Sequence, residues 1–539
     1  MNKPSEGPAP SVGPSRVVEA ALSDSAVTDS AVTDSAEYEI IIVGAGSAGS
    51  VLASRLTEQT DRSVLLLEAG QERAASSEAT HRVANGFSLE ASVHSETADR
   101  GTVELMAGRP AEVFSGRGLG GSSAVNGGYF IRGRPQDTEG LTAASEGLWS
   151  PQEILEAYSR SEKDLDFGSQ PGHGQSGPLP VRRDIQPMHP VSSAFTQACL
   201  ASGYQEEPDK NNSSPLGIGP VPFNIVDGVR VNTDAAYLQP NRDRNNLSIR
   251  MNSTVQRVVI EQGRAVGVQV RHEGQSRVIR SQHVVLCAGA QGSAKLLLLS
   301  GVGAADASRR LGIPVHADLP GVGSLISNHP TLDLMYRPVR SIAFPASSSF
   351  MQMALHLGPA GGDLEFMSTR RPYGQVTGLD PMDELLSIRI SLTLPQSRGS
   401  LQLRSADPQD QPVSSYHYLQ EDSDRERLRD AIRIAVELAE SPEFRPMVDQ
   451  LFGPESAVLS SNSQLDAWIQ QRLGTAFHLM GTCPMGPASD PSAVVDARCQ
   501  LHGLAGLSVV DTSILPRPWS RGPAAAAIMI GERAAKFFG

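Results

Sequence analysis

The stretch YEIIIVGAGSAG, residues 38–49, decides the fold of this chain. Its Ile40–Val43 part is a continuous β-branched run, which is typical of a strand buried on both faces. A G-x-G-x-x-G pattern follows, formed by Gly44, Gly46 and Gly49. The first glycine permits a tight turn, the second lets a pyrophosphate approach the backbone, and the third lets a helix pack on the strand. Glycine-rich turns also occur without a ligand, so the motif alone leaves both interpretations open.

The next segment supports a nucleotide site. We expect a helix over residues 50–60 and a second apolar strand over residues 63–67, which ends at Glu68. This acid lies about 20 residues after the last glycine of the motif, the spacing of a carboxylate that binds a ribose 2′-hydroxyl. The alternative is a solvated carboxylate at a strand end. The complete βαβ spacing favours an adenine dinucleotide, either FAD or NAD.

Composition restricts the class of protein. The 539 residues, with 39% hydrophobic and 19% charged content, suffice for two or more domains or one large two-layer body. The net charge of −13 argues against nucleic acid and against an anionic membrane surface as general partners. The four cysteines lack the spacing of a zinc site or a disulfide framework, so we predict reduced thiols and no metal; they are Cys199, Cys287, Cys483 and Cys499.

The N-terminal region is unlike the rest. Residues 1–37 are rich in Ser, Ala, Pro, Thr and Asp, and their small apolar content predicts a disordered tail. A misassigned start codon is the alternative. No window has the roughly 18 consecutive apolar residues of a spanning helix, and no signal-peptide core is visible. We therefore expect a cytoplasmic protein.

A second glycine-rich segment, GRGLGGSSAVNGGYFIRG, covers Gly116–Gly133. So many small residues indicate that something approaches the backbone closely. A flexible surface loop is the alternative, although apolar residues such as Val125, Tyr129 and Phe130 are unusual in a linker.

At this point the chain resembles a known family. Gly116–Glu139 is similar to the first signature of the glucose-methanol-choline (GMC) family of FAD-dependent oxidoreductases. The resemblance implies that the dinucleotide is FAD. Members with covalently held flavin carry histidine immediately before the asparagine of this loop; here Val125 precedes Asn126, which implies noncovalent FAD.

Further motifs extend the resemblance to residues 38–539. His283–Gly303 is similar to the second signature, with Ala294 where proline is usual, and Gly321–Pro330 ends in Asn328-His329 where Asp-His is usual. Thr233–Pro240 is predicted as a strand on the return into the FAD domain.

The implied fold class is α/β: a Rossmann-like FAD-binding domain with an α+β substrate domain built on an antiparallel sheet. The expected FAD-binding domain comprises residues 38–165, 230–330 and 475–539, and the substrate domain comprises residues 166–229 and 331–474. The predicted FAD-binding residues are Gly44, Gly46, Ser47, Ala48, Gly49, Glu68, Ala69, Arg117, Gly120, Gly121, Ser122, Asn126, Gly127, Val255, Ala288, Gly289 and Asp511.

The predicted catalytic base lies in the segment AFHLMGTCPMG. His478 stands there in a pattern that resembles the family's catalytic HxxGTxxMG motif. A histidine in an apolar setting is more often an ordinary core residue. With the motif around it, we predict that His478 removes the hydroxyl proton of a carbinol while hydride passes to flavin N5.

One departure affects the active site. The second active-site side chain of the family, histidine or asparagine, falls on Gly522. Two hypotheses remain: Ser520 or Arg521 reaches the same place, which we favour, or the second group is absent and the alkoxide is stabilised differently.

The ending SRGPAAAA resembles the branch associated with mycofactocin, a peptide-derived redox carrier. The implied donor is an alcohol or reduced mycofactocin, and the implied acceptor is a quinone or respiratory-chain component, which is compatible with peripheral contact at the inner membrane face. A GMC-fold lyase or photodecarboxylase is the alternative function, and a noncatalytic electron-relay protein is a third.

Overall fold

The computed structural model describes residues 32–33, 38–72, 76–86, 89, 96–183, 188–212, 215–339, 342, 349, 351–359, 361–369 and 385–538. The predicted disordered tail, residues 1–37, lies outside the described residues except for Val32–Thr33. These two residues form strand β1, which pairs with β15 in parallel. These two residues of the predicted tail therefore belong to a sheet.

A parallel sheet forms the centre of the FAD-side half. Its order is β12-β3-β2-β15, and β26 pairs with the opposite side of the same C-terminal part of β15, at Val284–Leu286. The buried β-branched run predicted the central strand, because both faces of a parallel sheet are covered by other layers. The strands are β2 (Tyr38–Val43), β3 (Val64–Leu67), β12 (Leu247–Arg250), β15 (Gln275–Leu286) and β26 (Leu507–Val509).

The first half of β15 belongs to an antiparallel meander. It pairs with β14 (Arg264–His272), which pairs with β13 (Ser253–Glu261). Gln262 and Gly263 make the tight turn between β13 and β14, and both have positive φ, 49° and 75°. Two consecutive positive φ values match the turn type that fits the twist of a hairpin.

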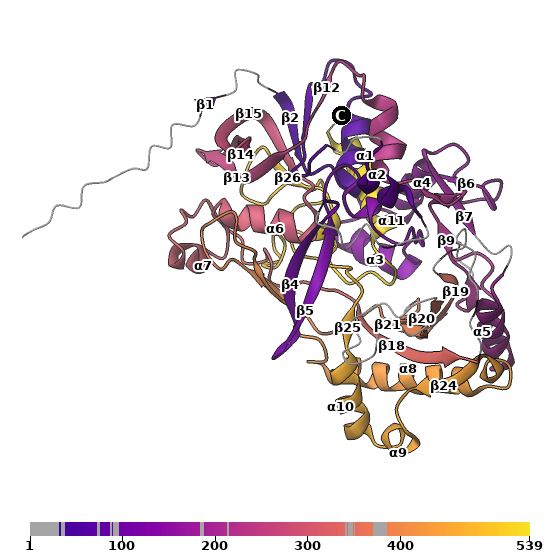
Figure 1. Ribbon diagram of the computed structural model, residues 1–539. Coiled ribbons are helices and arrows are strands. Elements are labelled where there is room, and N and C mark those ends of the chain that lie inside the picture. The colour runs from indigo at the N-terminus through magenta and orange to yellow at the C-terminus, as the bar shows by residue number, and fades with distance from the viewer. Residues whose placement is uncertain are drawn as a thin grey trace, which may run out of the picture.

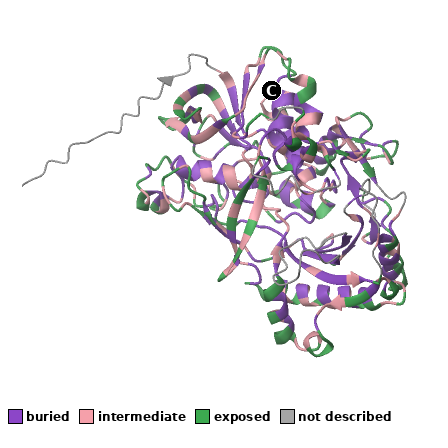
Figure 2. Ribbon diagram, in the orientation of Figure 1, coloured by how far each residue is buried: buried purple, intermediate pink, exposed green. Residues whose placement is uncertain are grey.

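Helices cover the parallel sheet (Figure 1). α1 (Ser47–Leu56) follows the first glycine turn and packs against α11 (Ala524–Ala534), and α11 packs against α4 (Pro151–Ser161). Ser150 caps α4 by accepting a hydrogen bond from the Glu153 N–H at 3.2 Å. The C-terminal helix therefore completes the layer that begins near the N-terminus, and Figure 2 shows this region as largely buried.

The second half of the molecule is built on an antiparallel sheet with the order β24-β18-β21-β20-β19-β8. Helix α8 (Asp422–Glu440) packs on β18, β20 and β21, and Figure 1 shows it below this sheet. The α+β prediction for this half is confirmed. The strands are β8 (Ile218–Pro220), β18 (Pro330–Pro338), β19 (Met351–Leu357), β20 (Leu364–Thr369), β21 (Leu386–Leu392) and β24 (Val448–Phe452).

One predicted strand is wrong. Thr233–Pro240 contains a π-helix, η3 (Asp234–Leu238), and the start of a 3₁₀ turn, η4 (Gln239–Asn241). The Asn232 side chain accepts a hydrogen bond from the Ala235 N–H, and η3 packs against α1. Packing on a helix outweighs the weak local preference for a strand.

A further sheet joins strands that are far apart in the sequence. Strands β4 (Ala98–Met106) and β5 (Arg109–Gly116) form a hairpin. β4 also pairs with β23 (Val413–Ser415), and β23 pairs with β22 (Ser400–Gln402). Residues from both predicted domains therefore share this sheet.

Candidate active site

The predicted FAD residues follow neighbouring strand ends. Val43 pairs with Leu67 and with Leu286, and Leu286 pairs with Val509. Gly44, Glu68, Ala288 and Asp511 therefore stand at one edge of the parallel sheet, just after the carboxyl ends of its strands. Ligands of open α/β sheets bind at this edge.

The glycine motif has the geometry that its sequence predicts. Gly44 has φ 102°, and a Cβ there would lie 2.6 Å from the Cys287 carbonyl oxygen. A Cβ on Gly49 would lie 2.0 Å from the Gly44 carbonyl oxygen. Only glycine, which has no Cβ, avoids these clashes, and the helix begins immediately after the turn.

The two glycine-rich segments touch each other. The Gly120 N–H donates to the Ala45 carbonyl at 2.9 Å, and a Cβ on Gly121 would lie 2.6 Å from the Gly46 Cα. A Cβ on Gly46 itself would find no neighbour closer than 4.0 Å. The side of Gly46 away from the backbone contact is therefore open at the start of α1, which fits a pyrophosphate.

Glu68 connects these segments. Its carboxylate accepts hydrogen bonds from three backbone N–H groups, those of Ala45 at 3.0 Å, Gly70 at 2.8 Å and Gly118 at 2.9 Å. A carboxylate accepts about four such bonds. Glu68 therefore shapes the cradle, and its contact with a ribose hydroxyl stays a prediction.

Asp511 makes a second connection. Its Oδ2 accepts from the Gly289 N–H at 3.0 Å and from the Ser293 hydroxyl at 2.6 Å, at the start of α6 (Gly289–Leu299). Burial raises the pKa of Asp511, and these hydrogen bonds oppose that rise. The segment after β26 is thus held against the N-terminus of α6.

The other predicted cofactor residues lie on the same two loops or on β13. Arg117 donates to the Ala69 carbonyl at 3.1 Å, and Asn126 accepts from the Gly128 N–H at 3.0 Å. Val255 lies on β13, whose first residue, Ser253, donates its N–H to the Glu68 carbonyl at 2.8 Å. Ser47 and Ala48 begin α1, Ser122 lies in the 3₁₀ turn η2 (Gly121–Ala124), and Gly127 follows it.

The segment with His478 is attached to this edge. The Thr482 hydroxyl donates to the Ala290 carbonyl at 2.7 Å, and the Gly481 N–H donates to the Thr512 carbonyl at 3.1 Å. These bonds hold the predicted base near α6 and the Asp511 segment. The proposed base and the proposed cofactor residues therefore converge.

His478 is paired with His329. The two Nδ1 atoms are 2.9 Å apart, and the rings meet edge to face with centroids 4.9 Å apart. His329 is 149 positions earlier in the chain. In the sequence, His329 stood out only as part of a departure from the family pattern.

The hydrogen bonds determine where the protons lie. The Trp519 carbonyl, 2.9 Å from His329 Nε2, can only accept, so His329 carries its proton on Nε2. His329 Nδ1 is then an acceptor, and His478 must donate to it from Nδ1. The Nε2 of His478 is therefore left with a free lone pair, as a general base requires.

Both imidazoles are neutral at ordinary pH. Burial lowers the pKa of His329 to about 4. Burial, and then the neighbouring His329, lower the pKa of His478 well below its usual value, while the negative charge of Glu365 opposes this. The base is thus ready to accept a proton over a wide pH range.

Asn328 and Phe477 determine the backbone conformation next to the two histidines. The Asn328 side-chain oxygen accepts from the N–H groups of His329 and His478, both at 2.8 Å. An aspartate, usual in the family, would accept in the same way, so this departure preserves the contact. Phe477 has φ 61°, a conformation that costs about 1–3 kcal/mol for a non-glycine residue and that is common at functional sites.

The structure places Ser520 and Arg521 in hydrogen bonds of their own. The Ser520 hydroxyl donates to Asp137 at 2.6 Å, and Arg521 donates to the carbonyls of Ser520, Gly361 and Gly362. Both side chains are fully buried. Their predicted role as the second active-site group stays a prediction, and these contacts favour the alternative hypothesis that Gly522 leaves that group absent.

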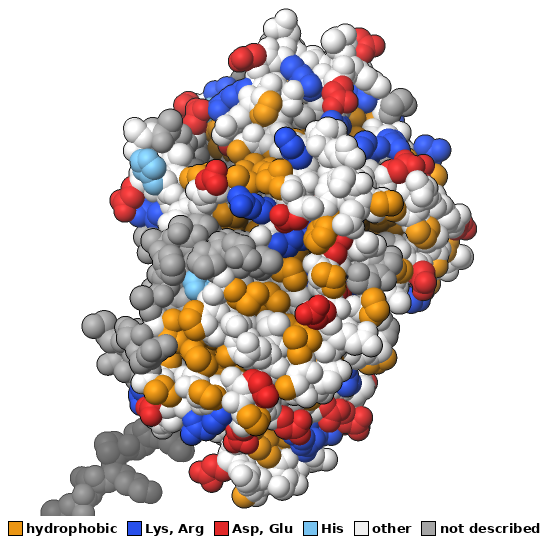
Figure 3. All heavy atoms as spheres, turned by 90° about the vertical axis from the view of Figure 1, so that its right-hand side faces the viewer, with side chains coloured by type: hydrophobic (Ala, Val, Ile, Leu, Met, Phe, Trp, Pro, Cys, Tyr) orange, Lys and Arg blue, Asp and Glu red, His pale blue; other side chains and the backbone are white. Residues whose placement is uncertain are grey.

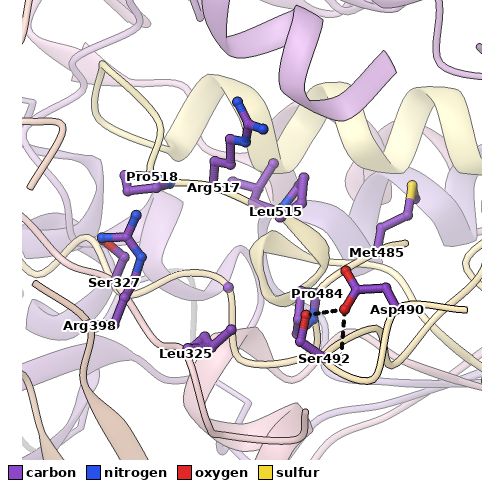
Figure 4. Close-up of a pocket in the computed structure, with 12 residues that line it drawn as sticks. Leu325, Ser327, Arg398, Pro484, Met485, Asp490, Ser492, Leu515, Arg517 and Pro518 are labelled. Atoms are coloured by element: carbon purple, nitrogen blue, oxygen red, sulfur yellow. Dashed lines mark hydrogen bonds between the residues drawn. The ribbon is translucent and has the colours of Figure 1, made fainter. Parts of the chain in front are cut away.

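A small pocket, shown in Figure 4, is lined by residues of the segments that carry the two histidines. Ser327 and Gly481, close in sequence to His329 and His478, both line it. Arg398 and Ser327 face it in Figure 4, whereas Asp490 bonds to Ser492. The pocket contains none of the predicted FAD residues.

The comparisons with known proteins agree with this geometry. The N-terminal model of the GMC oxidoreductases matches residues 38–331, and their C-terminal model matches residues 395–531. The chain belongs to the GMC oxidoreductase family. It is therefore an FAD-dependent oxidoreductase, as the two signatures predicted, whereas the mycofactocin branch is not confirmed.

Relatives of the chain include an uncharacterised GMC-type oxidoreductase of Rhodococcus erythropolis, 37% identical over 92% of this chain and 97% of the relative. An oxygen-dependent choline dehydrogenase of Stenotrophomonas maltophilia is 34% identical over 93% and 94%. The solved structure of a pyridoxine 4-oxidase (Mesorbium loti) has a TM-score of 0.86 and 29% identity over 93% of this chain and 99% of that one. Formate oxidase from Aspergillus oryzae, at 21% identity and a TM-score of 0.84 over 94% and 98%, shares the fold.

In the part of the chain that the structure describes, no helix combines the length and the apolar character of a membrane span. Figure 3 shows acidic and basic side chains interspersed on one face of the molecule. One member of the site, His329, had no clear signal in the sequence. The Asn328-His329 departure was its only visible hint.

Proposed function

We propose that this protein is an FAD-dependent dehydrogenase that oxidises a CH–OH donor, with His478 as the base. The observation that carries the proposal is the hydrogen bond between His478 and His329, since it leaves the Nε2 lone pair of His478 free. A base that must remove a hydroxyl proton needs such a lone pair at working pH.

The two glycine-rich segments would hold the cofactor, with the pyrophosphate at Gly46 and the start of α1, and Glu68 near the ribose. Bound FAD would supply the hydride acceptor. Val125, in place of a histidine, supports noncovalent attachment. Acid precipitation tests this: the yellow colour should stay in the supernatant.

His478 would take the hydroxyl proton of the donor on Nε2 while remaining bound to His329 through Nδ1. The positive charge that it acquires is favoured by the nearby carboxylate of Glu365. The donor carbon must be held at the hydride acceptor at the same time, which is the alignment that an enclosed site provides.

The donor is a small alcohol or a reduced redox carrier. The names of the relatives, choline dehydrogenase and pyridoxine 4-oxidase, support a CH–OH donor. Reduced mycofactocin remains a candidate on the C-terminal motif alone. We propose a quinone or respiratory-chain component as acceptor.

Anaerobic flavin reduction tests the function. In the dark and under nitrogen, n-butanol, benzyl alcohol, choline and mycofactocinol are added to the FAD-loaded protein, and the flavin absorbance is followed. One of them should bleach it. A lyase or photodecarboxylase would not be reduced in this way, so an unchanged spectrum with every donor would contradict the proposal.

His478→Ala should lower the limiting rate of reduction by about 10²–10⁴-fold, the usual contribution of a general base. His502→Ala is the matched control, because this histidine bonds to the Gly486 carbonyl outside the pair. Equal rates for the two variants, at equal FAD content, would exclude His478 as the base.

A further inference from the structure

Gly522 lies between His478 and Tyr129. A Cβ built on Gly522 would be 3.2 Å from His478 Cε1, 3.3 Å from His478 Nε2 and 3.3 Å from Tyr129 Cδ1. These distances are shorter than ordinary van der Waals contacts. The space of the missing family side chain is therefore bounded by the base on one side and by the Tyr129 ring on the other.

Tyr129 is held by a carboxylate. Its hydroxyl donates to Glu365 on β20 at 2.6 Å. Burial, and then the neighbouring Glu365, raise the pKa of Tyr129 well above its usual value. Tyr129 thus keeps its proton, which points to Glu365, and cannot act as a competing base.

Glu365 is fixed in turn. Its Oε2 is 3.0 Å from His356 Nε2, and His356 Nδ1 is 3.1 Å from Lys210 Nζ. Because the ammonium can only donate, His356 Nδ1 accepts and Nε2 carries the proton that goes to Glu365. Burial opposes ionisation of Glu365, but the contacts with His356, the hydrogen bond from Tyr129 and the charge of Arg521 together outweigh it and lower the pKa of Glu365 to about 2.

The chain of bonds continues to a buried ion pair. Lys210 Nζ donates to Glu207 Oε2 at 2.7 Å, and Arg134 Nη1 donates to Glu207 Oε1 at 3.1 Å. Glu207, Lys210 and His356 are at most 1% exposed. Networks that are satisfied in this way are rigid, so the Tyr129 ring has one orientation.

We propose that Tyr129 contacts the donor opposite His478 and takes the place of the side chain that is missing at position 522, and that Glu365 is a positioning residue that acts through Tyr129. The inference deepens the proposed function and rests on it. The Tyr129 ring forms the wall that keeps the carbinol carbon of the donor aligned with the hydride acceptor. Because its hydroxyl proton is donated to Glu365, the Tyr129 oxygen can only accept a hydrogen bond from the donor.

The experiment is a double-mutant cycle on positions 129 and 522, measured with the donor that reduces the wild-type flavin. Tyr129→Ala should lower the limiting reduction rate about tenfold, because the wall is lost. Gly522→Asn should also lower it, since the new Cβ crowds His478 and Tyr129. The double variant should be faster than Tyr129→Ala, because the asparagine enters the vacated space; additive losses would overturn the inference.

A second pair of variants covers the case in which Tyr129→Ala fails to fold. Tyr129→Phe and Tyr237→Phe each remove one tyrosine–glutamate bond, since Tyr237 donates to Glu532 at 2.7 Å. Both should retain FAD and lose similar stability. Only Tyr129→Phe should lower the limiting reduction rate, by about three- to tenfold, with the larger change in rate rather than in donor affinity; equal rates would overturn the inference.

The two proposals fail in different ways. If no alcohol reduces the wild-type flavin, the proposed function fails and the inference falls with it. If the wild type is reduced and the 129 and 522 variants match it, the inference alone fails.

Discussion

Two buried histidine sites of this protein differ in charge: one is neutral and the other is positive. In the histidine pair, His329 and His478 face each other and a backbone carbonyl, and both are neutral. In the carboxylate cluster, the residues Glu162, Asp164 and Asp209 surround His173. Burial alone would lower the pKa at both sites, so the partners decide the charge.

The three carboxylates of the cluster favour a charged ring. His173 Nε2 is 2.8 Å from Asp209, and Nδ1 is 3.1 Å from Asp164 and 3.3 Å from Glu162. A neutral ring would turn a lone pair toward a carboxylate. Burial lowers the pKa of His173, but the neighbouring carboxylates of Asp164, Asp209 and Glu162 together outweigh it and raise the pKa to about 10.

The cluster also contains two guanidinium groups. Arg183 binds Asp164 at 2.6 Å and Asp209 at 2.8 Å, and Arg132 binds Glu162. With His173 protonated, three positive charges match the three buried negative ones, and Asp166, 3.6 Å from Arg183, is partly exposed. Glu162, Asp164 and His173 are close enough to hold a metal ion, but this charge balance describes a complete ion-pair cluster.

Breaking the cluster should have the largest effect. His173→Leu leaves three buried carboxylates against two arginines, and we expect a loss of about 3–5 kcal/mol in the free energy of unfolding. Urea unfolding measures it. His502→Leu serves as a control, since its ring bonds to a single carbonyl.

The same variant sharpens the comparison. Folded, FAD-loaded His173→Leu should be reduced at the wild-type rate, because the cluster stabilises the fold and lies outside the proposed chemistry. A large loss of rate per bound flavin would show that the two sites are coupled.

Breaking the pair should have a smaller effect on stability and a clear effect on rate. His329→Leu removes the acceptor of the His478 Nδ1 proton, so His478 loses its fixed tautomer. We expect the limiting reduction rate to fall about 10- to 100-fold, part of the 10²–10⁴ that a base contributes. An unchanged rate in stopped-flow reduction would mean that the Nδ1–Nδ1 bond does not orient the base.

The pH dependence of stability should reflect the charged histidine. The folded pKa of His173, about 10, lies above the usual histidine value of 6.5. Its contribution to stability is therefore complete below about pH 6.5 and is lost as the pH rises through about 10. Denaturation midpoints of wild type and His173→Leu should converge in that range, and parallel curves would contradict the charge assignment.

The pH dependence of rate should reflect the neutral histidine and is the smallest effect. Because the pKa of His478 is lowered, the unprotonated base persists on the acid side of the usual histidine range. The limiting reduction rate should stay flat through the usual histidine range and fall only on its acid side. A midpoint at or above the usual histidine pKa would contradict the neutral pair.

Local sequence predicted elements whose residues agree with their surroundings. The run before Gly44 became β2, and the apolar run before Glu68 became β3. The strand prediction for Thr233–Pro240 was wrong, because packing against α1 stabilises a helical turn there. Such cases follow when tertiary contacts outweigh a weak local preference.

The sequence by itself determined the family, the cofactor and the identity of the histidine motif, because glycine geometry and motif spacing are local properties. Tertiary structure alone brought His329 to His478, Tyr129 to the side of Gly522 and three carboxylates to His173. The protonation state of an imidazole depends on partners that are distant in the chain, so no local pattern could have assigned a free base to one histidine and a positive charge to another.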